Sequence, residues 1–98
     1  MQQAELDKAI ISLGPELGPD VVTLRYSLDK DWTDDPAIYF RVVLSDQAGK
    51  RDRLRESARR VTSIIEQHLE PVEQWGLLYY FNFRSQSEQE ALKDKDWE

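Results

Sequence analysis

Three segments of this chain alternate apolar and polar residues, and this alternation limits the fold more strongly than any other feature. They cover residues 21–28, 37–45 and 77–84. Successive side chains of a β-strand point to opposite faces, so each segment is expected to be a strand with one buried face. The residues predicted to face the core are Val22, Leu24, Tyr26, Leu28, Ile38, Phe40, Val42, Leu44, Leu77, Tyr79, Phe81 and Phe83.

Helices are predicted on either side of these strands. Residues 3–13 have the apolar spacing of an amphipathic helix, which Gly14 and Pro15 end. Residues 51–69 predict a longer helix that ends at Pro71 and carries an apolar stripe made of Leu54, Ala58, Val61, Ile65 and Leu69. Ser87 and Glu90 have the spacing of a capping box, which predicts a short charged helix that frays before Trp97.

The element order is therefore helix, strand, strand, helix, strand and short C-terminal helix. This order predicts a single α+β domain over residues 1–98, with a charged, partly helical tail at 85–98. The three-stranded sheet is expected to be mainly antiparallel. A right-handed crossover through the long helix places the helices on one face of the sheet. The other face is then expected to be solvated, or covered by a second copy or a partner.

That second face carries the main candidate site. Its outward residues are rich in arginine and tyrosine and include no carboxylate: Arg25, Tyr39, Arg41, Tyr80, Asn82 and Arg84. Tyrosine and arginine are enriched as anchors of protein interfaces, so we interpret the face as a protein-binding surface. The same residue types stack on bases and contact phosphates, which leaves RNA binding as the alternative. An ordinary exposed face without a partner is the third interpretation.

The charge distribution bears on the choice of partner. The net charge of −6 argues against a general nucleic-acid binder, because phosphate contacts normally require an excess of cations. Residues 50–60 nevertheless carry a local charge of +4, which leaves −10 for the rest of the chain. Arg51, Arg55 and Arg59 follow one flank of the long helix at steps of four. A solvated helix is the favoured interpretation of this flank, and contact with an acidic partner is the second.

The connection between the first two strands is acidic and contains Trp32. It carries four aspartates in the segment 29–35. Trp32 is a candidate anchor for a partner; the loop is alternatively expected to fold back onto the arginines of the long helix, or to be mobile. A cation site is disfavoured because the loop lacks the spacing, the turn glycine and the distal glutamate of an EF-hand.

Few residues are suited to catalysis. The chain has no cysteine and a single histidine, His68, which the helical spacing places at the edge of the apolar stripe. One histidine does not make a multi-histidine metal site, and no glycine-rich segment has the spacing of a phosphate-binding loop. We therefore expect no cofactor and no metal, and a small enzyme centred on His68 is the least favoured hypothesis.

These observations predict a small, non-catalytic, cytoplasmic protein that binds itself as a homodimer or binds another protein. The N-terminal residues mix charged and apolar side chains, so they do not resemble a signal peptide, and no segment is long enough to span a membrane. An antitoxin-like, inhibitor-like or regulatory subunit fits the size and charge by analogy alone. The alternative is an RNA-binding or ribosome-associated module that uses the same face.

Overall fold

A mixed sheet of three strands organises the chain. A computed structural model describes residues 3–98, and its strands β1 (Val21–Lys30), β2 (Pro36–Leu44) and β3 (Leu78–Ser85) lie in the order β1-β2-β3. β1 and β2 form an antiparallel hairpin, whereas β3 runs parallel to β2. The predicted α+β order with two strands before the long helix and one after it is confirmed.

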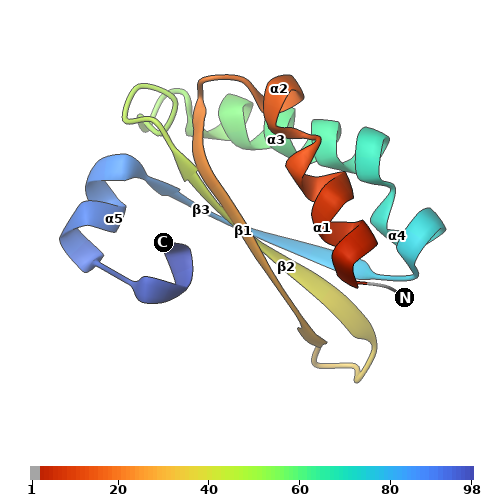
Figure 1. Cartoon of the computed structure of the whole chain (residues 1–98). Coiled ribbons are helices and arrows are strands. Elements are labelled where there is room, and N and C mark those ends of the chain that lie inside the picture. The colour runs from red at the N-terminus through yellow and green to blue at the C-terminus, as the bar shows by residue number, and fades with distance from the viewer. Residues whose placement is uncertain (1–2) are drawn as a thin grey trace.

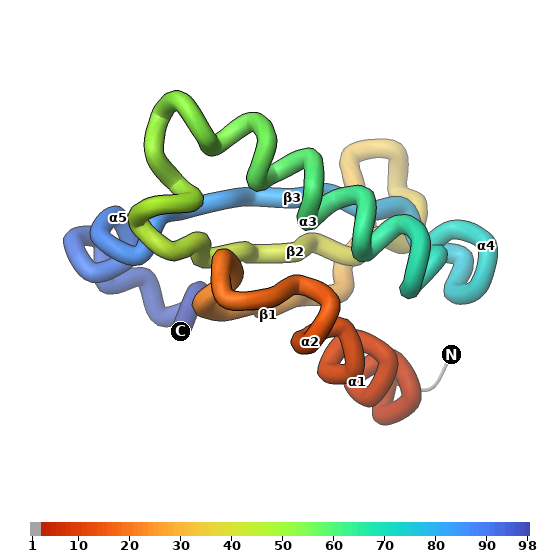
Figure 2. Tube along the Cα trace, turned by 90° about the horizontal axis from the view of Figure 1, so that it is seen from above, coloured from red at the N-terminus to blue at the C-terminus, as the bar shows by residue number. Residues whose placement is uncertain are grey.

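The helices divide between the two faces of the sheet. α1 (Gln3–Ile11), α2 (Gly14–Leu17), α3 (Leu54–Leu69) and α4 (Pro71–Trp75) lie on one side. α5 (Gln86–Leu92) and the 3₁₀ turn η1 (Lys95–Trp97) lie on the other side (Figure 1). Seen from above, α3 runs along β2 and β3, and α1 lies beside the β1 edge (Figure 2). None of the described helices combines the length and apolar character needed to cross a membrane.

The core lies between the sheet and α1 to α3. The inward side predicted for β2 is confirmed, since Ile38, Phe40, Val42 and Leu44 are fully buried. Burial does not alternate along the strand, however, because Val43, which was expected to face outward, is also buried. Leu6 and Ile10 of α1 and Val61, Ile65 and Leu69 of α3 complete the cluster from the helix side. Burying one such side chain fully contributes about 1.5 to 3 kcal/mol. The core therefore supplies the rigid support for the opposite face of the sheet.

Two residues that were predicted to face the core, Val22 and Leu54, are exposed instead. The register shifts between Val21 and Thr23, which leaves Val22 47% exposed while Val21 packs against the core. A bulge adds one residue to a strand and so reverses which side chains point inward. At the start of α3, Leu54 is 39% exposed and Ser57 is buried, with its hydroxyl donating to the Ala48 carbonyl over 2.8 Å.

The tail helix begins two residues earlier than predicted. Ser85, and not Ser87, is the N-cap: its hydroxyl accepts from the Glu88 amide, and the Glu88 carboxylate accepts from the Ser85 amide. The capping-box spacing occurs at both serines, so spacing alone could not choose between them. Ser87 instead donates from its amide and hydroxyl to Asp46, over 2.8 and 2.6 Å, which lowers the pKa of that carboxyl. α5 ends at Leu92, before Trp97 as predicted, and Trp97 itself lies in η1 and is buried.

Candidate functional site

The strand register brings the predicted site residues together and separates them into two groups. Arg25 lies opposite Arg41, and Asn82 lies beside Arg41 on β3. Tyr39 and Tyr80 are neighbours further along the same two strands. We call the first region, with Arg25, Arg41 and Arg84, the arginine half. The second region, the tyrosine half, contains Tyr39, Tyr80 and the hairpin loop, which comprises residues 29–35, the end of β1 and the turn after it. Figures 1 and 2 show the tail at one end of the sheet and the hairpin loop at the other.

The arginine half is covered by the chain's own tail. The Arg25 Nε donates to the main-chain oxygen of Glu98 over 2.7 Å, and the Arg41 Nε donates to the carbonyl of Asp96 over 2.7 Å. The Arg41 Nη1 also donates to the Ser27 hydroxyl, over 2.9 Å, which orients its guanidinium group. Two of the predicted arginines therefore hold main-chain oxygens of one short peptide segment.

Arg84 contacts side chains of the same segment. Its guanidinium carbon lies 4.1 Å from the centre of the Trp97 ring, and its Nη1 forms an ion pair of 3.5 Å with Asp94. The same Nη1 donates to Gln89 of α5 over 3.0 Å. Trp97 is only 7% exposed as a result. The expectation that the second face is left uncovered by the chain itself is therefore wrong for the arginine half.

The arginine half has the chemistry of a peptide site. Bonds to main-chain oxygens hold a segment whatever its side chains are, whereas the contacts of Arg84 require a carboxylate and an aromatic ring. An arginine fork suits both kinds of contact, because its donors lie in one plane and its face is available for stacking. The site thus holds an acidic, tryptophan-bearing segment within the same chain.

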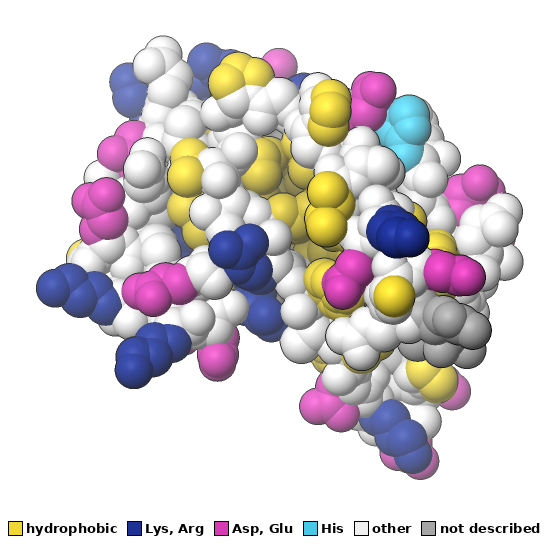
Figure 3. Space-filling model, in the orientation of Figure 1, with side chains coloured by type: hydrophobic (Ala, Val, Ile, Leu, Met, Phe, Trp, Pro, Cys, Tyr) yellow, Lys and Arg dark blue, Asp and Glu magenta, His cyan; other side chains and the backbone are white. Residues whose placement is uncertain are grey.

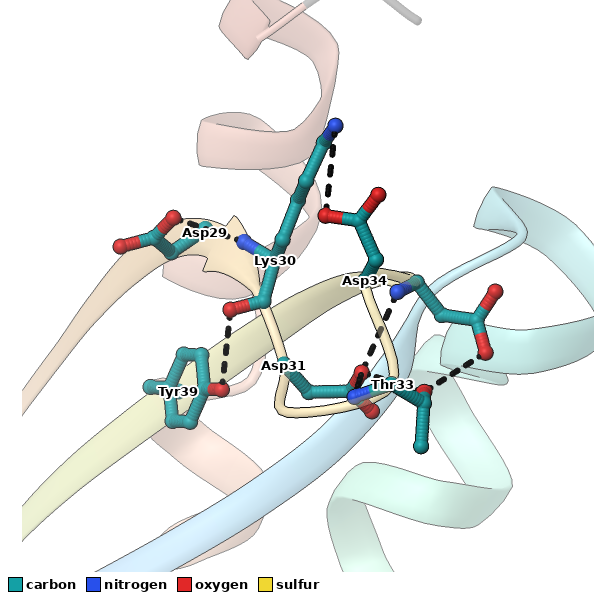
Figure 4. Close-up of polar contacts among 7 residues, drawn as sticks. Asp29, Lys30, Asp31, Thr33, Asp34 and Tyr39 are labelled. Carbon is teal, nitrogen blue, oxygen red and sulfur yellow. Dashed lines mark hydrogen bonds and ion pairs between the residues drawn. The ribbon is translucent and has the colours of Figure 1, made fainter.

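The tyrosine half is a rigid aromatic surface. The rings of Tyr39 and Tyr80 stack, with centres 5.2 Å apart and planes at 19°. The Tyr80 hydroxyl donates to the Asp31 carboxylate over 2.8 Å, and this contact raises the pKa of Tyr80. The Tyr39 hydroxyl donates to the Lys30 carbonyl over 3.4 Å (Figure 4). Both tyrosines therefore brace the hairpin loop.

The hairpin loop is built around the carboxylate of Asp31. One oxygen of this group accepts from the amide and the hydroxyl of Thr33, over 2.9 and 2.6 Å, and from the amide of Asp35, over 3.2 Å (Figure 4). These bonds, the Thr33 hydroxyl foremost and the Tyr80 hydroxyl next, lower the pKa of Asp31 to about 2. Asp31 is 8% exposed, whereas the neighbouring Trp32 is 90% exposed. The loop presents Trp32 to solvent and does not fold it back onto α3.

The basic flank of α3 lies apart from this face. Arg51, Arg55 and Arg59 are all exposed. Arg51 lies in the turn before α3, because the helix begins at Leu54 and not at residue 51 as predicted. Within residues 3–98, the ion pairs are those of Lys30 with Asp34 and of Arg84 with Asp94, so the three arginines form none with neighbouring carboxylates. Their contact with an acidic partner stays a prediction.

His68 was expected to be partly buried at the edge of the core, and this expectation is wrong. It is exposed and lines a shallow surface hollow with residues of α1 and α4, among them Glu5 and Trp75. Helical spacing placed it beside Ile65 and Leu69, but α3 turns this side chain outward. Among residues 3–98, no three histidine or carboxylate side chains are grouped in a way that could hold a metal ion.

A second surface was not predicted. A hollow of about 210 Å³ lies between β1 and the N-terminal helices, and Figure 3 shows apolar side chains gathered there. Ile11, Val22 and Leu24 are among its lining residues, and Ile11 is 75% exposed. The bulge that turns Val22 outward contributes to this hollow, and the alternating pattern gave no sign of the bulge.

The tail residues are the part of the site that sequence reasoning missed. A signal was present, because the four residues Asp94-Lys95-Asp96-Trp97 repeat the four residues Asp29-Lys30-Asp31-Trp32 of the hairpin loop. The first set covers the arginine half, and the second adjoins the tyrosine half. Both ends of the face are therefore in contact with the same short sequence.

Comparison with known proteins gave no match to a family model, to a curated protein or to a solved structure. Indications of function therefore come from the geometry of the sheet face and from the residues that contact it.

Proposed function

We propose that this chain is a small, non-catalytic binding module that holds a short acidic segment of a protein partner on the arginine half of its sheet face. The observation that carries the proposal is the position of the tail. Arg25 and Arg41 hold its main-chain oxygens, and Arg84 holds Asp94 and Trp97. A partner segment with the same chemistry would make the same contacts once the tail has left.

The remainder of the face supports a wider interface. Tyr39 and Tyr80 are partly exposed and already ordered, so a partner would lose little side-chain entropy by binding them. Asn82 is exposed between the two halves, and Trp32 projects at the far end. The proposed contact surface therefore comprises the arginine half, the tyrosine half, Asn82 and Trp32.

We further propose that this small acidic module acts in the cytoplasm as a regulatory or inhibitory subunit, because its proposed action is to hold a peptide segment of another protein. The exposed arginines of α3 would provide a second contact to an acidic region of the partner. Binding a second copy, a homodimer, is one form of this function.

The direct test uses the tail as a peptide. A fluorescent peptide with the sequence of residues 92–98 is titrated into the full-length chain carrying Asp94→Ala and Trp97→Ala, which frees the arginine half. We expect saturable binding by fluorescence anisotropy, weakened at least about tenfold when Arg84→Ala is added, because the ion pair and the stacked ring are lost together. Wild-type chain should bind the peptide more weakly, since its own tail competes.

The RNA-binding alternative gives a different result. Single-stranded RNA is titrated into the same variant over a range of salt concentrations. Binding to phosphates weakens steeply as salt increases, whereas a contact made of main-chain oxygens and an aromatic ring is less sensitive. A folded variant that binds RNA in this salt-dependent manner and does not bind the peptide would overturn the proposal.

A further inference from the structure

The repeated four-residue sequence suggests what replaces the tail. In the tail, Asp-Lys-Asp-Trp covers the arginine half of its own chain. In the hairpin loop, the same sequence ends in Trp32, which is 90% exposed. A large aromatic side chain held at such exposure on a braced loop has the properties of an interface anchor.

Opposite charges favour contact between the hairpin loop of one copy and the arginine half of another. Residues 29–35 carry four aspartates and one lysine, a net charge of −3. The arginine half has three guanidinium groups. Asp31 is engaged with Thr33 and Tyr80. Lys30 engages one oxygen each of Asp29 and Asp34, so the groups available to a partner are the Trp32 ring and the second carboxylate oxygen of each of these two residues. These are a ring and carboxylates, the two kinds of group that Arg84 contacts in the tail.

The loop cannot reach the arginine half of its own chain. The two regions lie at opposite ends of the sheet, as both views show (Figures 1 and 2). Two copies stacked face to face about a two-fold axis would place each loop on the arginine half of the other. Such an arrangement uses the same patch twice and closes as a dimer, so it does not propagate into a filament.

We propose that two copies of this chain pair through this sheet face, each hairpin loop occupying the arginine half of the other copy in place of its tail. This inference rests on the proposed function, because it requires that the arginine half accept a segment other than the tail. The tail then controls self-association. It competes from within the same chain, where its effective concentration is on the order of millimolar, so the wild-type chain is a monomer at micromolar concentration.

The experiment compares the wild-type chain with the full-length Asp94→Ala, Trp97→Ala variant by sedimentation velocity, from about 10 to about 500 µM, concentrations below the effective concentration of the tail. We expect a monomer for the wild-type chain and a concentration-dependent dimer for the variant. Adding Trp32→Ala should return the variant to a monomer. Ile11→Ala is the matched control, because Ile11 is also a large exposed apolar residue but lies on α1, and it should leave the dimer intact.

The peptide of residues 92–98 separates failure of this inference from failure of the proposed function. If self-association is correct, the peptide dissociates the dimer of the variant. A variant that binds the peptide but remains a monomer at every concentration would overturn the inference and leave the proposed function standing. A dimer that persists with Trp32→Ala would overturn it as well. A variant with a native circular-dichroism spectrum that binds no peptide would overturn both.

A second variant keeps the inference testable if the double variant does not fold. Asp94→Ala alone removes the ion pair with Arg84 and the cap that Asp94 provides to the Asp96 amide, and it leaves Trp97 in place. If the double variant does not fold, this single variant should still dimerise at lower concentration than the wild-type chain. An unchanged monomer in the single variant, with the tail amides exchanging faster, would contradict the inference.

Discussion

The hairpin loop and the tail contain the same four residues but bury opposite members of the set. In the loop, the second aspartate, Asp31, is 8% exposed and the tryptophan, Trp32, is 90% exposed. In the tail, the corresponding aspartate, Asp96, is exposed and Trp97 is 7% exposed. The same local sequence thus presents an aromatic ring to solvent at one end of the sheet and hides one at the other.

The difference comes from what the sheet offers at each end. A carboxylate is buried without large cost only where donors surround it, and the tyrosine half provides the hydroxyls of Tyr80 and Thr33 for Asp31. The arginine half provides instead the flat face of Arg84, on which an indole ring stacks. Burial of Trp97 is therefore decided by the neighbouring strand, whereas burial of Asp31 depends on Thr33 and Asp35 of its own loop as well as on Tyr80 of β3.

The largest effect is expected for Trp97→Ala, which should destabilise the tail far more than Trp32→Ala destabilises the chain. Trp97→Ala removes a buried ring and should reduce the free energy of tail docking by about 2 to 4 kcal/mol, from the area that a tryptophan buries. Amide exchange at Trp97, which donates to the Asp94 carbonyl, should then become at least about thirtyfold faster. Exchange in β2 serves as the internal reference. If amide exchange became faster by the same factor in the tail and in β2, the tail would not detach independently of the core.

The next effect concerns the buried aspartate. The pKa of Asp31 in the folded chain is about 2, below its ordinary value of 3.8, so its contribution to stability is fully present above about pH 4 and is lost as the pH falls toward 2. Urea unfolding at pH 5, 4, 3 and 2 should show this loss for the wild-type chain. Asp31→Asn, which cannot ionise, should unfold more easily at pH 5 and lose this part of the pH dependence.

Two further variants test which hydrogen bond contributes most to the low pKa of Asp31. Thr33→Val should raise the pKa of Asp31 more than Tyr80→Phe does, because the Thr33 hydroxyl is the largest cause of the shift. Titration of the Asp31 carboxyl followed by NMR measures both changes. The reverse order would show that Tyr80 of β3, and not Thr33 of the loop, determines the protonation state of this carboxylate.

A smaller effect is expected for Arg84→Lys. Lysine keeps the charge opposite Asp94 but loses the plane that lies over Trp97, so tail docking should weaken by about 1 kcal/mol. Tail amide exchange would accelerate roughly fivefold, which corresponds to that free energy. Because lysine retains the ion pair, an effect as large as that of Arg84→Ala would mean that stacking, and not charge, holds the tail.

The smallest effect is expected for Trp32→Ala in the wild-type chain. Its side chain is almost fully exposed, so the free energy of unfolding should change by less than about 0.5 kcal/mol. Urea denaturation measures the change. A loss comparable to that of Trp97→Ala would abolish the contrast between the two segments and would indicate that Trp32 packs onto the same chain in solution.

The sequence was sufficient for the features that depend on local periodicity. The inward side of β2, the apolar face of α3 from Val61 to Leu69 and the placement of tyrosines and arginines together on the second face all follow from the period of the side chains. They could be predicted because a strand or helix repeats the same geometry at every residue, whatever lies elsewhere in the chain.

The remaining features depend on contacts between distant parts of the chain. The position of Trp97 requires Arg84 from β3, while Arg25 and Arg41 from β1 and β2 hold the main chain of the same tail. Periodicity within one segment carries no information about such a meeting. The bulge at Val22 and the choice of Ser85 as the cap are local, but two alternatives satisfied the same pattern at each position.

The bonds between Ser87 and Asp46 limit how far the chain rearranges when Trp97 leaves its site. They fasten α5 to the turn after β2, so movement begins beyond α5, at Lys93, whose φ is 51°. The five residues that follow reach at most about 18 Å when extended. Detachment of this segment is thus a local event, and a ligand that captures the vacated site should alter the melting temperature of the core only through its own binding energy.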